Sequence, residues 1–299
     1  MRLAQIRDFV AVAENGSLRS AARSVGVSQP AITKSIRQLE DELQVKLLQR
    51  SSRGAVTTLA GKSFLARARV VQAELRKAAE DFHAMRGGAG GSVAFGVAPQ
   101  ICMLLVPEAL AQFRRRHAEA RVRIVEGVST GLVEGVRDET LDFSIGMRSS
   151  KPPEPALRFR PLLRPQLVVA GRKGHPLARA GSLRELEQAS WLMYYPLGAG
   201  AMLEQAFTSA GVAMPKAIVQ CESYATALAV LAATDTLGLL IPQMLQDPYG
   251  RERLQRIAVQ ETIPAPVIGM FWRADAPLTP VAAAMAQAIT AVARRLARS

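Results

Sequence analysis

Four side chains between Gln29 and Arg37 could form hydrogen bonds and ion pairs from one face of a helix. Gln29, Thr33 and Arg37 recur at intervals of four residues, with Lys34 beside them. A glutamine can bind the edge of an adenine through two hydrogen bonds, and a threonine can donate, accept or touch a thymine methyl group. Lys34 and Arg37 suit phosphate oxygens. These residues therefore predict a helix that could read DNA bases.

The segment GVSTG, Gly127–Gly131, offers a second kind of chemistry because it fits the G-x-S-x-G pattern of a hydrolase nucleophile elbow. It also stands between a predicted strand and a predicted helix, as such an elbow does. A catalytic triad would need an acid and a histidine later in the chain, and only His175 follows. A serine hydrolase with Ser129 as nucleophile is therefore an alternative, but the chain is not expected to be an enzyme.

Metal and redox chemistry find little support in the sequence. The three histidines and two cysteines have no metal-ligand spacing, so no metal or other cofactor is expected. Cys102 and Cys221 lie far apart and no secretion signal precedes them, so both are expected to be reduced thiols. A redox pair between them is left open.

Three short helices would position the face from Gln29 to Arg37. Apolar spacing predicts helices over residues 2–14 and 18–25, and Ser28 can cap a third helix. Pro30 falls in the first turn of that helix, where its missing N–H costs nothing. The apolar stripe that would anchor this helix consists of Ile32, Ile36, Leu39 and Leu43. The arrangement predicts a helix-turn-helix, and residues 49–61 predict a β-hairpin wing behind it.

The third helix is acidic only in its second half. Glu40, Asp41 and Glu42 follow the residues that would face DNA. Acids at this end would not meet phosphate oxygens. The helix is therefore expected to have one end for DNA and one end for its own domain.

The stretch from Thr58 to Arg86 predicts one long helix. Its apolar residues follow a heptad pattern, with alternating steps of four and three: Phe64, Ala68, Val71, Leu75, Ala78, Phe82 and Met85. Such a helix could pair with a second copy of the chain or pack on its own domain. The glycine-rich segment that follows, residues 87–91, predicts a flexible joint.

The charge of the chain is concentrated in these N-terminal elements. The net charge is +13, and residues 1–86 hold 15 Lys+Arg against 8 Asp+Glu, so that part carries +7. A basic domain of this size favours a polyanion partner, although a solvated basic face would look the same. No apolar run is long enough to span a bilayer, so we expect a cytoplasmic protein without membrane contact.

Beyond the joint, strands and helices alternate. Residues 92–147 read as β-α-β-α-β, which predicts a parallel sheet. A proline-rich break follows at 151–155. Further strands are predicted at 165–178, 190–196, 216–222, 236–242 and 265–273. Helices are predicted at 104–117, 132–140, 201–210, 223–233 and 279–299. The fold class is therefore multidomain α+β.

Several short motifs between Phe9 and Gly61 come together in one pattern. They are S-Q-P-A at the start of the third helix, I-x-x-L-E in its second half, L-L-x-R before the wing and T-x-A-G at the start of the long helix. In these motifs the chain resembles the LysR-type transcriptional regulators. The order of the later segments, with GHPLA at 174–178, is similar to that family as well, so the resemblance covers essentially the whole chain.

The resemblance implies a division of the chain into five parts. These are a winged helix-turn-helix domain at 1–57, a dimerisation (linker) helix at 58–86, a hinge at 87–91, regulatory subdomain I at 92–162 and 266–299, and regulatory subdomain II at 163–265. The two subdomains together would resemble a periplasmic binding protein.

The resemblance also implies a function. Family members are usually tetramers that bind an interrupted palindrome near a promoter, and they change DNA bending when a small effector enters the cleft between the subdomains. The expected partners are double-stranded DNA, further copies of the chain through the linker helix and a small effector. RNA polymerase is a candidate partner. A DNA-bound repressor that acts without an effector is the main alternative.

Carried onto this chain, the resemblance gives two sets of site residues. The expected DNA contacts are Ser28, Gln29, Pro30, Thr33, Lys34, Arg37, Arg50, Ser52 and Arg53. The expected effector contacts are Ala98, Pro99, Gln100, Ile101, Ser129, Thr130, Met147, Arg148, Tyr195, Leu197, Ala201 and Ser223. Many family members carry Ser or Thr just after the first regulatory strand, where this chain has alanine, proline and glutamine. Backbone N–H groups or the Gln100 amide would then bind the effector, which is expected to be an organic anion.

Overall fold

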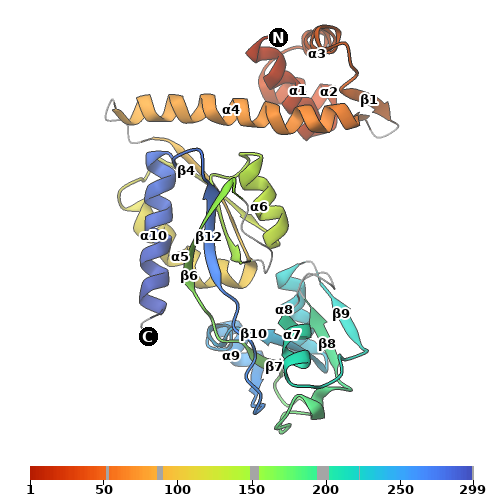
Figure 1. Cartoon of the computed structure of the whole chain (residues 1–299), viewed down its shortest axis with the longest axis vertical. Coiled ribbons are helices and arrows are strands. Elements are labelled where there is room, and N and C mark those ends of the chain that lie inside the picture. The colour runs from red at the N-terminus through yellow and green to blue at the C-terminus, as the bar shows by residue number, and fades with distance from the viewer. Residues whose placement is uncertain (52–53, 86–89, 149–154, 194–201, 222, 298–299) are drawn as a thin grey trace.

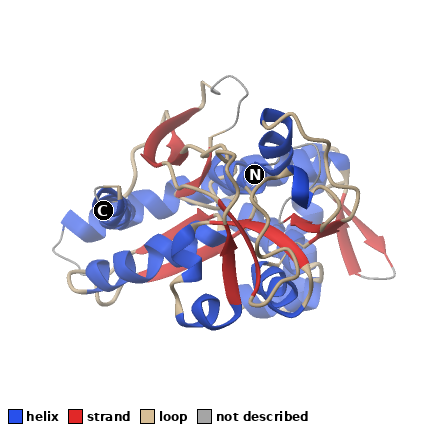
Figure 2. Ribbon diagram, turned by 90° about the horizontal axis from the view of Figure 1, so that it is seen from below, coloured by secondary structure: helices blue, strands red, loops and turns tan. Residues whose placement is uncertain are grey.

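The computed structural model describes the chain except for residues 52–53, 86–89, 149–154, 194–201, 222 and 298–299. Figure 1 shows three parts along the long axis of the molecule. A small helical domain lies on one long helix, a first sheet flanked by helices follows, and a second sheet lies at the far end. Figure 2 shows the same helices and strands from below.

The N-terminal domain is a helix-turn-helix followed by a two-stranded wing. Its elements are α1 (Leu3–Asn15), α2 (Leu18–Val25), α3 (Gln29–Leu43), β1 (Leu48–Ser51) and β2 (Gly54–Thr57). The predicted cap is confirmed, because the hydroxyl of Ser28 accepts a hydrogen bond from Ala31 N at 3.3 Å and Pro30 lies in the first turn. Gly26 ends α2 with φ 72°, a left-handed conformation that glycine adopts without strain.

The predicted apolar stripe of α3 is confirmed at three of its four positions. Ile32, Ile36 and Leu39 lie in one core with Phe9 of α1. Leu43 was expected to complete the stripe, and this is wrong, because 37% of its surface is exposed. It is the last residue of the helix, and the chain turns away at Gln44, whose φ is 52°.

The long helix α4 (Leu59–Met85) differs between its two halves. Ala68 is buried in the core of the N-terminal domain, and Phe64 meets Phe9 with 5.2 Å between the ring centroids. Farther along the heptad pattern, three large apolar side chains are exposed: Val71, Leu75 and Phe82. Phe64 and Ala68 thus pack on the N-terminal domain, while Val71, Leu75 and Phe82 leave apolar surface that the described residues do not cover.

The first sheet has the strand order β4-β3-β5-β12-β6. Its strands are β3 (Ser92–Val97), β4 (Arg121–Glu126), β5 (Phe143–Met147), β6 (Leu157–Leu163) and β12 (Ile268–Arg273). The predicted parallel order is confirmed for β4, β3 and β5, whereas β12 runs antiparallel to both of its neighbours. The strand β6 was not predicted.

Three helices cover this sheet. Helices α5 (Pro99–Arg114) and α10 (Pro280–Leu296) share its main core, and α6 (Ser129–Arg137) packs on a separate apolar cluster. Figure 1 shows α10 and α6 on opposite sides of β12. Helix α5 begins five residues before the predicted start at Leu104. Ala98 at the cap has no capping side chain, and the one local signal for this start, Pro99 at the first helical position, was missed.

The second sheet has the strand order β11-β7-β10-β8-β9. Its elements are β7 (Val168–Arg172), β8 (Ser190–Met193), α7 (Met202–Ser209), β9 (Ile218–Gln220), α8 (Tyr224–Ala233), β10 (Thr236–Leu240), α9 (Pro248–Arg253) and β11 (Leu254–Ile257). Neither α9 nor β11 was predicted, because both are short and α9 has no apolar periodicity. The chain passes between the two sheets twice, from β6 to β7 and from β11 to β12.

The described elements give two further findings. None of the helices seen in the structure is both long and apolar enough to cross a membrane. Within the described residues, no three His, Cys, Asp or Glu side chains are grouped so that they could hold a metal ion.

Candidate nucleic-acid interface and ligand cleft

The start of α3 presents most of the residues expected to contact DNA. Ser28, Gln29, Pro30, Lys34 and Arg37 are all exposed, and α3 buries the opposite side in the domain core. The hydrogen-bond donor Gln29 and the two cations Lys34 and Arg37 are therefore exposed together on the first part of α3. This is the part of the helix that reaches base edges in helix-turn-helix proteins.

Thr33 is half-buried, and part of its hydrogen-bonding capacity is already used. Its hydroxyl donates to the carbonyl oxygen of Gln29 at 2.8 Å. The hydroxyl hydrogen is therefore not free for a base or a phosphate. The methyl group and the lone pairs of the oxygen are what this side chain can offer.

The other end of α3 is fixed by a buried carboxylate. Glu40 is 6% exposed and accepts hydrogen bonds from Leu47 N at 2.9 Å, Leu48 N at 3.1 Å and Lys46 Nζ at 2.7 Å. Burial alone would raise the pKa of Glu40, but the hydrogen bonds from Lys46, Leu48 and Leu47 outweigh burial and lower it. Glu40 thus ties α3 to the start of the wing. Sequence reasoning placed the acids at this end but missed that role.

The wing is an antiparallel pair in which Ser51 faces Gly54. Ser52 and Arg53, two expected DNA contacts, lie outside the described residues. Arg50 is the third residue of β1, and only its backbone is described. The structure thus gives the course of both wing strands.

The expected effector residues of the first sheet lie at the carboxyl ends of its strands. Ala98 N donates to Ile145 O at 3.0 Å, and Ser129 Oγ accepts from Met147 N at 3.2 Å, so the loops after β3 and β5 and the start of α6 meet at one edge. The side chains of Ala98, Pro99 and Ile101 are buried in the protein. Ligands in open α/β folds bind at such an edge.

Arg148 and Thr130 are exposed at the same edge. The guanidinium of Arg148 lies 5.4 Å from the ring centroid of Phe159 on β6. At this distance the positive charge is attracted to the face of the ring. Arg148 is thus an exposed cation that follows β5 directly.

From the second sheet, the structure describes one expected effector contact. Ser223 caps α8, and its hydroxyl accepts from Thr226 N at 3.4 Å. Tyr195, Leu197 and Ala201 lie outside the described residues. The Ser223 hydroxyl is therefore engaged with its own helix, α8.

Gln100 crosses from one sheet to the other. Its Oε1 accepts from Ile241 N at 3.0 Å, and its Nε2 donates to Leu239 O at 3.3 Å. The two backbone groups stand at the end of β10 in the second sheet. Leu104, one turn farther along α5, packs against the cores of both sheets. The two subdomains are thus joined here by an amide and an apolar side chain.

Two family models cover nearly all of the chain. The lysR-family bacterial regulatory helix-turn-helix protein model matches residues 3–62, and the LysR substrate binding domain model matches residues 86–294. The chain belongs to the LysR family. It is a LysR-type DNA-binding transcriptional regulator with a substrate-binding domain.

Individual relatives and solved structures are similar over most of this LysR-type regulator. The HTH-type transcriptional regulator GbpR of Azospirillum brasilense is 28% identical over 287 residues, which is 94% of this chain and 83% of GbpR. A full-length OxyR variant from Pseudomonas aeruginosa has a TM-score of 0.70 at 23% identity and covers 100% of this chain and 97% of its own. Full-length CbnR with its target DNA has a TM-score of 0.68 at 23% identity, covering 98% and 100%. These proteins are regulators, not enzymes.

The geometry around Ser129 of this LysR-type regulator agrees with that conclusion. Ser129 begins α6 beside the first sheet, and its oxygen accepts from Met147 N. His175 lies after β7 of the second sheet, is 4% exposed, and its Nδ1 accepts from Leu177 N at 3.0 Å. Ser129 Oγ and His175 Nδ1 thus lie in different subdomains, and each accepts a hydrogen bond from a backbone N–H of its own subdomain. The G-x-S-x-G match is thus part of a strand-to-helix turn.

The two cysteines of the regulator are free and lie in different cores. Cys102 packs beside the core of the first sheet, and Cys221 lies in a core of the second sheet. Burial, with a smaller contribution from Glu126, raises the pKa of the Cys102 thiol, which makes it less reactive. The structure thus holds two separate thiols.

Buried ion pairs dock α4 on the first subdomain, which the sequence analysis missed. Arg76 Nη2 lies 3.0 Å from Asp142 Oδ1, and Lys77 Nζ lies 2.7 Å from Glu139 Oε2. Arg273 of β12 also pairs with Glu139. The side chains of Asp142 and Glu139 are each 2% exposed. Burial opposes the charge of Lys77, but hydrogen bonds to Glu139 and Glu74 outweigh it and raise the pKa of Lys77.

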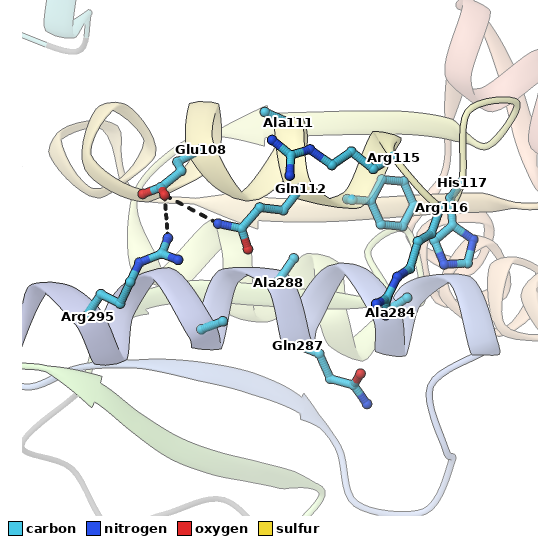
Figure 3. Close-up of a pocket in the computed structure, with 12 residues that line it drawn as sticks. Glu108, Ala111, Gln112, Arg115, Arg116, His117, Ala284, Gln287, Ala288 and Arg295 are labelled. Atoms are coloured by element: carbon cyan, nitrogen blue, oxygen red, sulfur yellow. Dashed lines mark hydrogen bonds and ion pairs between the residues drawn. The ribbon is translucent and has the colours of Figure 1, made fainter.

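A groove of 680 Å³ lies between α5 and α10, away from the strand ends where the effector contacts were expected (Figure 3). Small side chains such as Ala111 and Ala288 line it, and an ion pair between Glu108 and Arg295 crosses it. Figure 3 shows Arg115, Arg116 and His117 on the α5 side. None of these residues belongs to the expected effector set.

Proposed function

We propose that this LysR-type regulator reads an operator with the exposed start of α3 and the wing. The observation that carries the proposal is the polarity of α3, whose exposed end holds Gln29, Lys34 and Arg37 while Glu40 fixes its other end. Ser28, Pro30, Thr33, Arg50, Ser52 and Arg53 complete the proposed DNA contacts. The similarity in fold to CbnR, which was solved with its target DNA, supports this assignment.

The linker helix is proposed to pair with α4 of a second copy. The exposed side chains of Val71, Leu75 and Phe82 would be buried by such a pairing. Two recognition helices would then reach two half-sites of one duplex. A tetramer built from two such dimers, acting on DNA in the cytoplasm, is the assembly that we propose. RNA polymerase is a further proposed partner at the promoter.

The cleft between the subdomains is proposed to bind a small organic anion that alters DNA binding or bending. The proposed contacts are Ala98, Pro99, Gln100, Ile101, Ser129, Thr130, Met147, Arg148, Tyr195, Leu197, Ala201 and Ser223. Arg148 supplies the positive charge in this set, and the first turns of α5 and α6 supply backbone N–H groups that have no partner within the helix. A regulator without an effector is the second candidate, and the engagement of Gln100 with Leu239 and Ile241 favours it.

Footprinting of the DNA upstream of the gene for this chain tests both proposals. Wild type and Gln29→Ala are compared on that DNA and in selection from random sequences, with and without a panel of metabolites. We expect Gln29→Ala to relax base preference at one position in each half-site, by about 1–3 kcal/mol. Arg184→Ala, an exposed residue of the second subdomain, is the control. An unchanged consensus for Gln29→Ala would remove that residue from the base contacts.

A further inference from the structure

The Gln100 carboxamide occupies a hydrogen-bonding position on the backbone of the second subdomain. Leu239 O and Ile241 N flank Leu240 at the end of β10, and Gln100 binds both. A strand that pairs with β10 would use the same carbonyl and N–H. The Gln100 side chain thus makes the two hydrogen bonds that a bound molecule with one donor and one acceptor would make to Leu239 O and Ile241 N.

We infer that Gln100 is a built-in ligand of the cleft, and that a molecule replacing it must carry a neighbouring donor and acceptor, as a primary carboxamide does. The inference rests on the proposed function of the cleft. It concerns only the part of the ligand that meets Leu239 O and Ile241 N, which would be a neutral amide, and leaves the anionic group of the proposed effector to the other contacts. When no small molecule is present, the Gln100 side chain then occupies the two hydrogen-bonding groups of Leu239 and Ile241.

The two backbone partners decide between an amide and a carboxylate. Ile241 N can only donate, and Leu239 O can only accept. An ionised carboxylate has acceptors alone, so one of its oxygens would face the lone pairs of Leu239 O. A carboxamide satisfies both groups. The same pair fixes the orientation of the Gln100 amide, with its oxygen toward Ile241 and its nitrogen toward Leu239.

The neighbouring polar side chains of the cleft are engaged in a similar way. Ser129 Oγ accepts from Met147 N, and Ser223 Oγ accepts from Thr226 N. These hydroxyls are bound within their own subdomains, whereas the Gln100 amide joins the two. A glutamine has the length to cross between the sheets that a serine or threonine at this position would lack. Release of Gln100 would therefore remove the polar contact that the described residues make between the subdomains here, and the apolar contact of Leu104 would remain.

Hydrogen exchange at the Ile241 amide tests the inference directly. The full-length protein is compared without DNA as wild type, Gln100→Ala and Gln100→Leu, of which the last keeps the side-chain volume and removes both polar partners. We expect the Ile241 amide to exchange about three- to tenfold faster in both variants. Gln112→Ala is the matched control, because Gln112 lies on the same helix and bonds Glu108. Its Ile241 amide should exchange at the wild-type rate.

Small probes then test the ligand class. Acetamide added to Gln100→Ala should slow the exchange of Ile241 toward the wild-type rate, and sodium acetate should not. Gln100→Glu should behave like Gln100→Ala. Equal exchange in wild type and both Gln100 variants would overturn the built-in ligand, and protection by acetate would overturn the amide class.

Failure of the proposed function would look different. The exchange experiment contains no DNA and no metabolite, so it reads the Gln100 contact alone. Loss of operator binding in wild type, or a footprint that no metabolite changes, would contradict the proposed function while Ile241 exchange still answers the question about Gln100. A footprint change in Gln100→Ala alone, restored by acetamide, would support both.

Discussion

The contacts that run from α3 through α4 to the first subdomain differ in kind from those at the strand ends where we propose a ligand cleft. The first set is built on buried carboxylates with cationic partners: Glu40 with Lys46, Asp142 with Arg76, and Glu139 with Lys77 and Arg273. The second set is neutral, because Gln100, Ser129 and Ser223 bind backbone groups. Ion pairs therefore stabilise the contacts from α3 to the first subdomain, and neutral hydrogen bonds that a ligand or water could replace stabilise the contacts of Gln100, Ser129 and Ser223.

This difference has a physical consequence for how a signal could travel. Removing one partner of a buried ion pair leaves a charge without compensation, which costs several kcal/mol. A neutral hydrogen bond contributes only about 0.5–1.5 kcal/mol net, since water or a ligand can replace it. Helix α4 should therefore move with the first subdomain as one body. The second subdomain should be the part that a small molecule can shift.

The largest expected effect comes from breaking the docking of α4. Arg76→Ala leaves the Asp142 carboxylate 2% exposed without its guanidinium partner. Because Arg76 is itself one-third exposed, we expect a loss of about 2–3 kcal/mol in the free energy of unfolding, below the value for a fully buried pair. Urea unfolding measures it. Arg295→Ala breaks the exposed pair with Glu108 and should cost less than about 1 kcal/mol. Equal losses in the two variants would contradict the comparison.

A somewhat smaller loss is expected at the anchor of the recognition helix. Glu40→Ala leaves the N–H groups of Leu47 and Leu48 without their acceptor. We expect about 2 kcal/mol less stability and weaker operator binding, because α3 loses its tie to the wing. Asp41→Ala, on the neighbouring exposed position, is the control. Anisotropy with labelled operator DNA measures the binding. If Glu40→Ala bound DNA as wild type does, the anchor would have no part in positioning α3.

Local signals in the sequence predicted the N-terminal domain well. Ser28 and Pro30 mark the start of α3, and both act within four residues of themselves. The start of α5 was misplaced because Ala98 carries no capping side chain and the signal of Pro99 at the first helical position was overlooked. The heptad of α4 was visible, but the sequence could not say that Ala68 would pack inside its own domain while Val71 would stay exposed.

The contacts that join the parts could not be read from the sequence. Gln100 and Leu239 are 139 residues apart, and Arg76 and Asp142 are 66 residues apart. No periodicity links such positions, since their distance in space depends on how the sheets and α4 come together. The residue types were informative only in part. Gln100 was expected to touch an effector, and its engagement with β10 is visible only in the structure.

The ion-paired region and the hydrogen bonds of Gln100 should respond differently to acid. The pKa of Glu40 is lowered in the folded state, so its contribution to stability is present above the unfolded pKa near 4.5 and is lost as pH falls through the folded pKa. Wild type should therefore lose more stability than Glu40→Gln between about pH 6 and pH 3. The protection factor of the Ile241 amide, corrected for intrinsic exchange, should change little as pH falls from about 6 to about 5, before the carboxylates titrate. A loss of Ile241 protection in that range would show that the cleft also depends on charge.

The smallest effect is expected at a neutral contact of the cleft that stays within one subdomain. Ser129→Ala removes the acceptor of Met147 N, and we expect a loss of about 1 kcal/mol in urea unfolding. Ser209→Ala is the control, because its exposed hydroxyl donates to Gln205 O within α7 and its loss should stay within about 0.5 kcal/mol. Protection of the Ile241 amide should be unchanged in both variants, since neither touches Gln100. A loss of protection in Ser129→Ala would mean that the loops after β3 and β5 hold the amide in place, and the cleft would then act as one connected network.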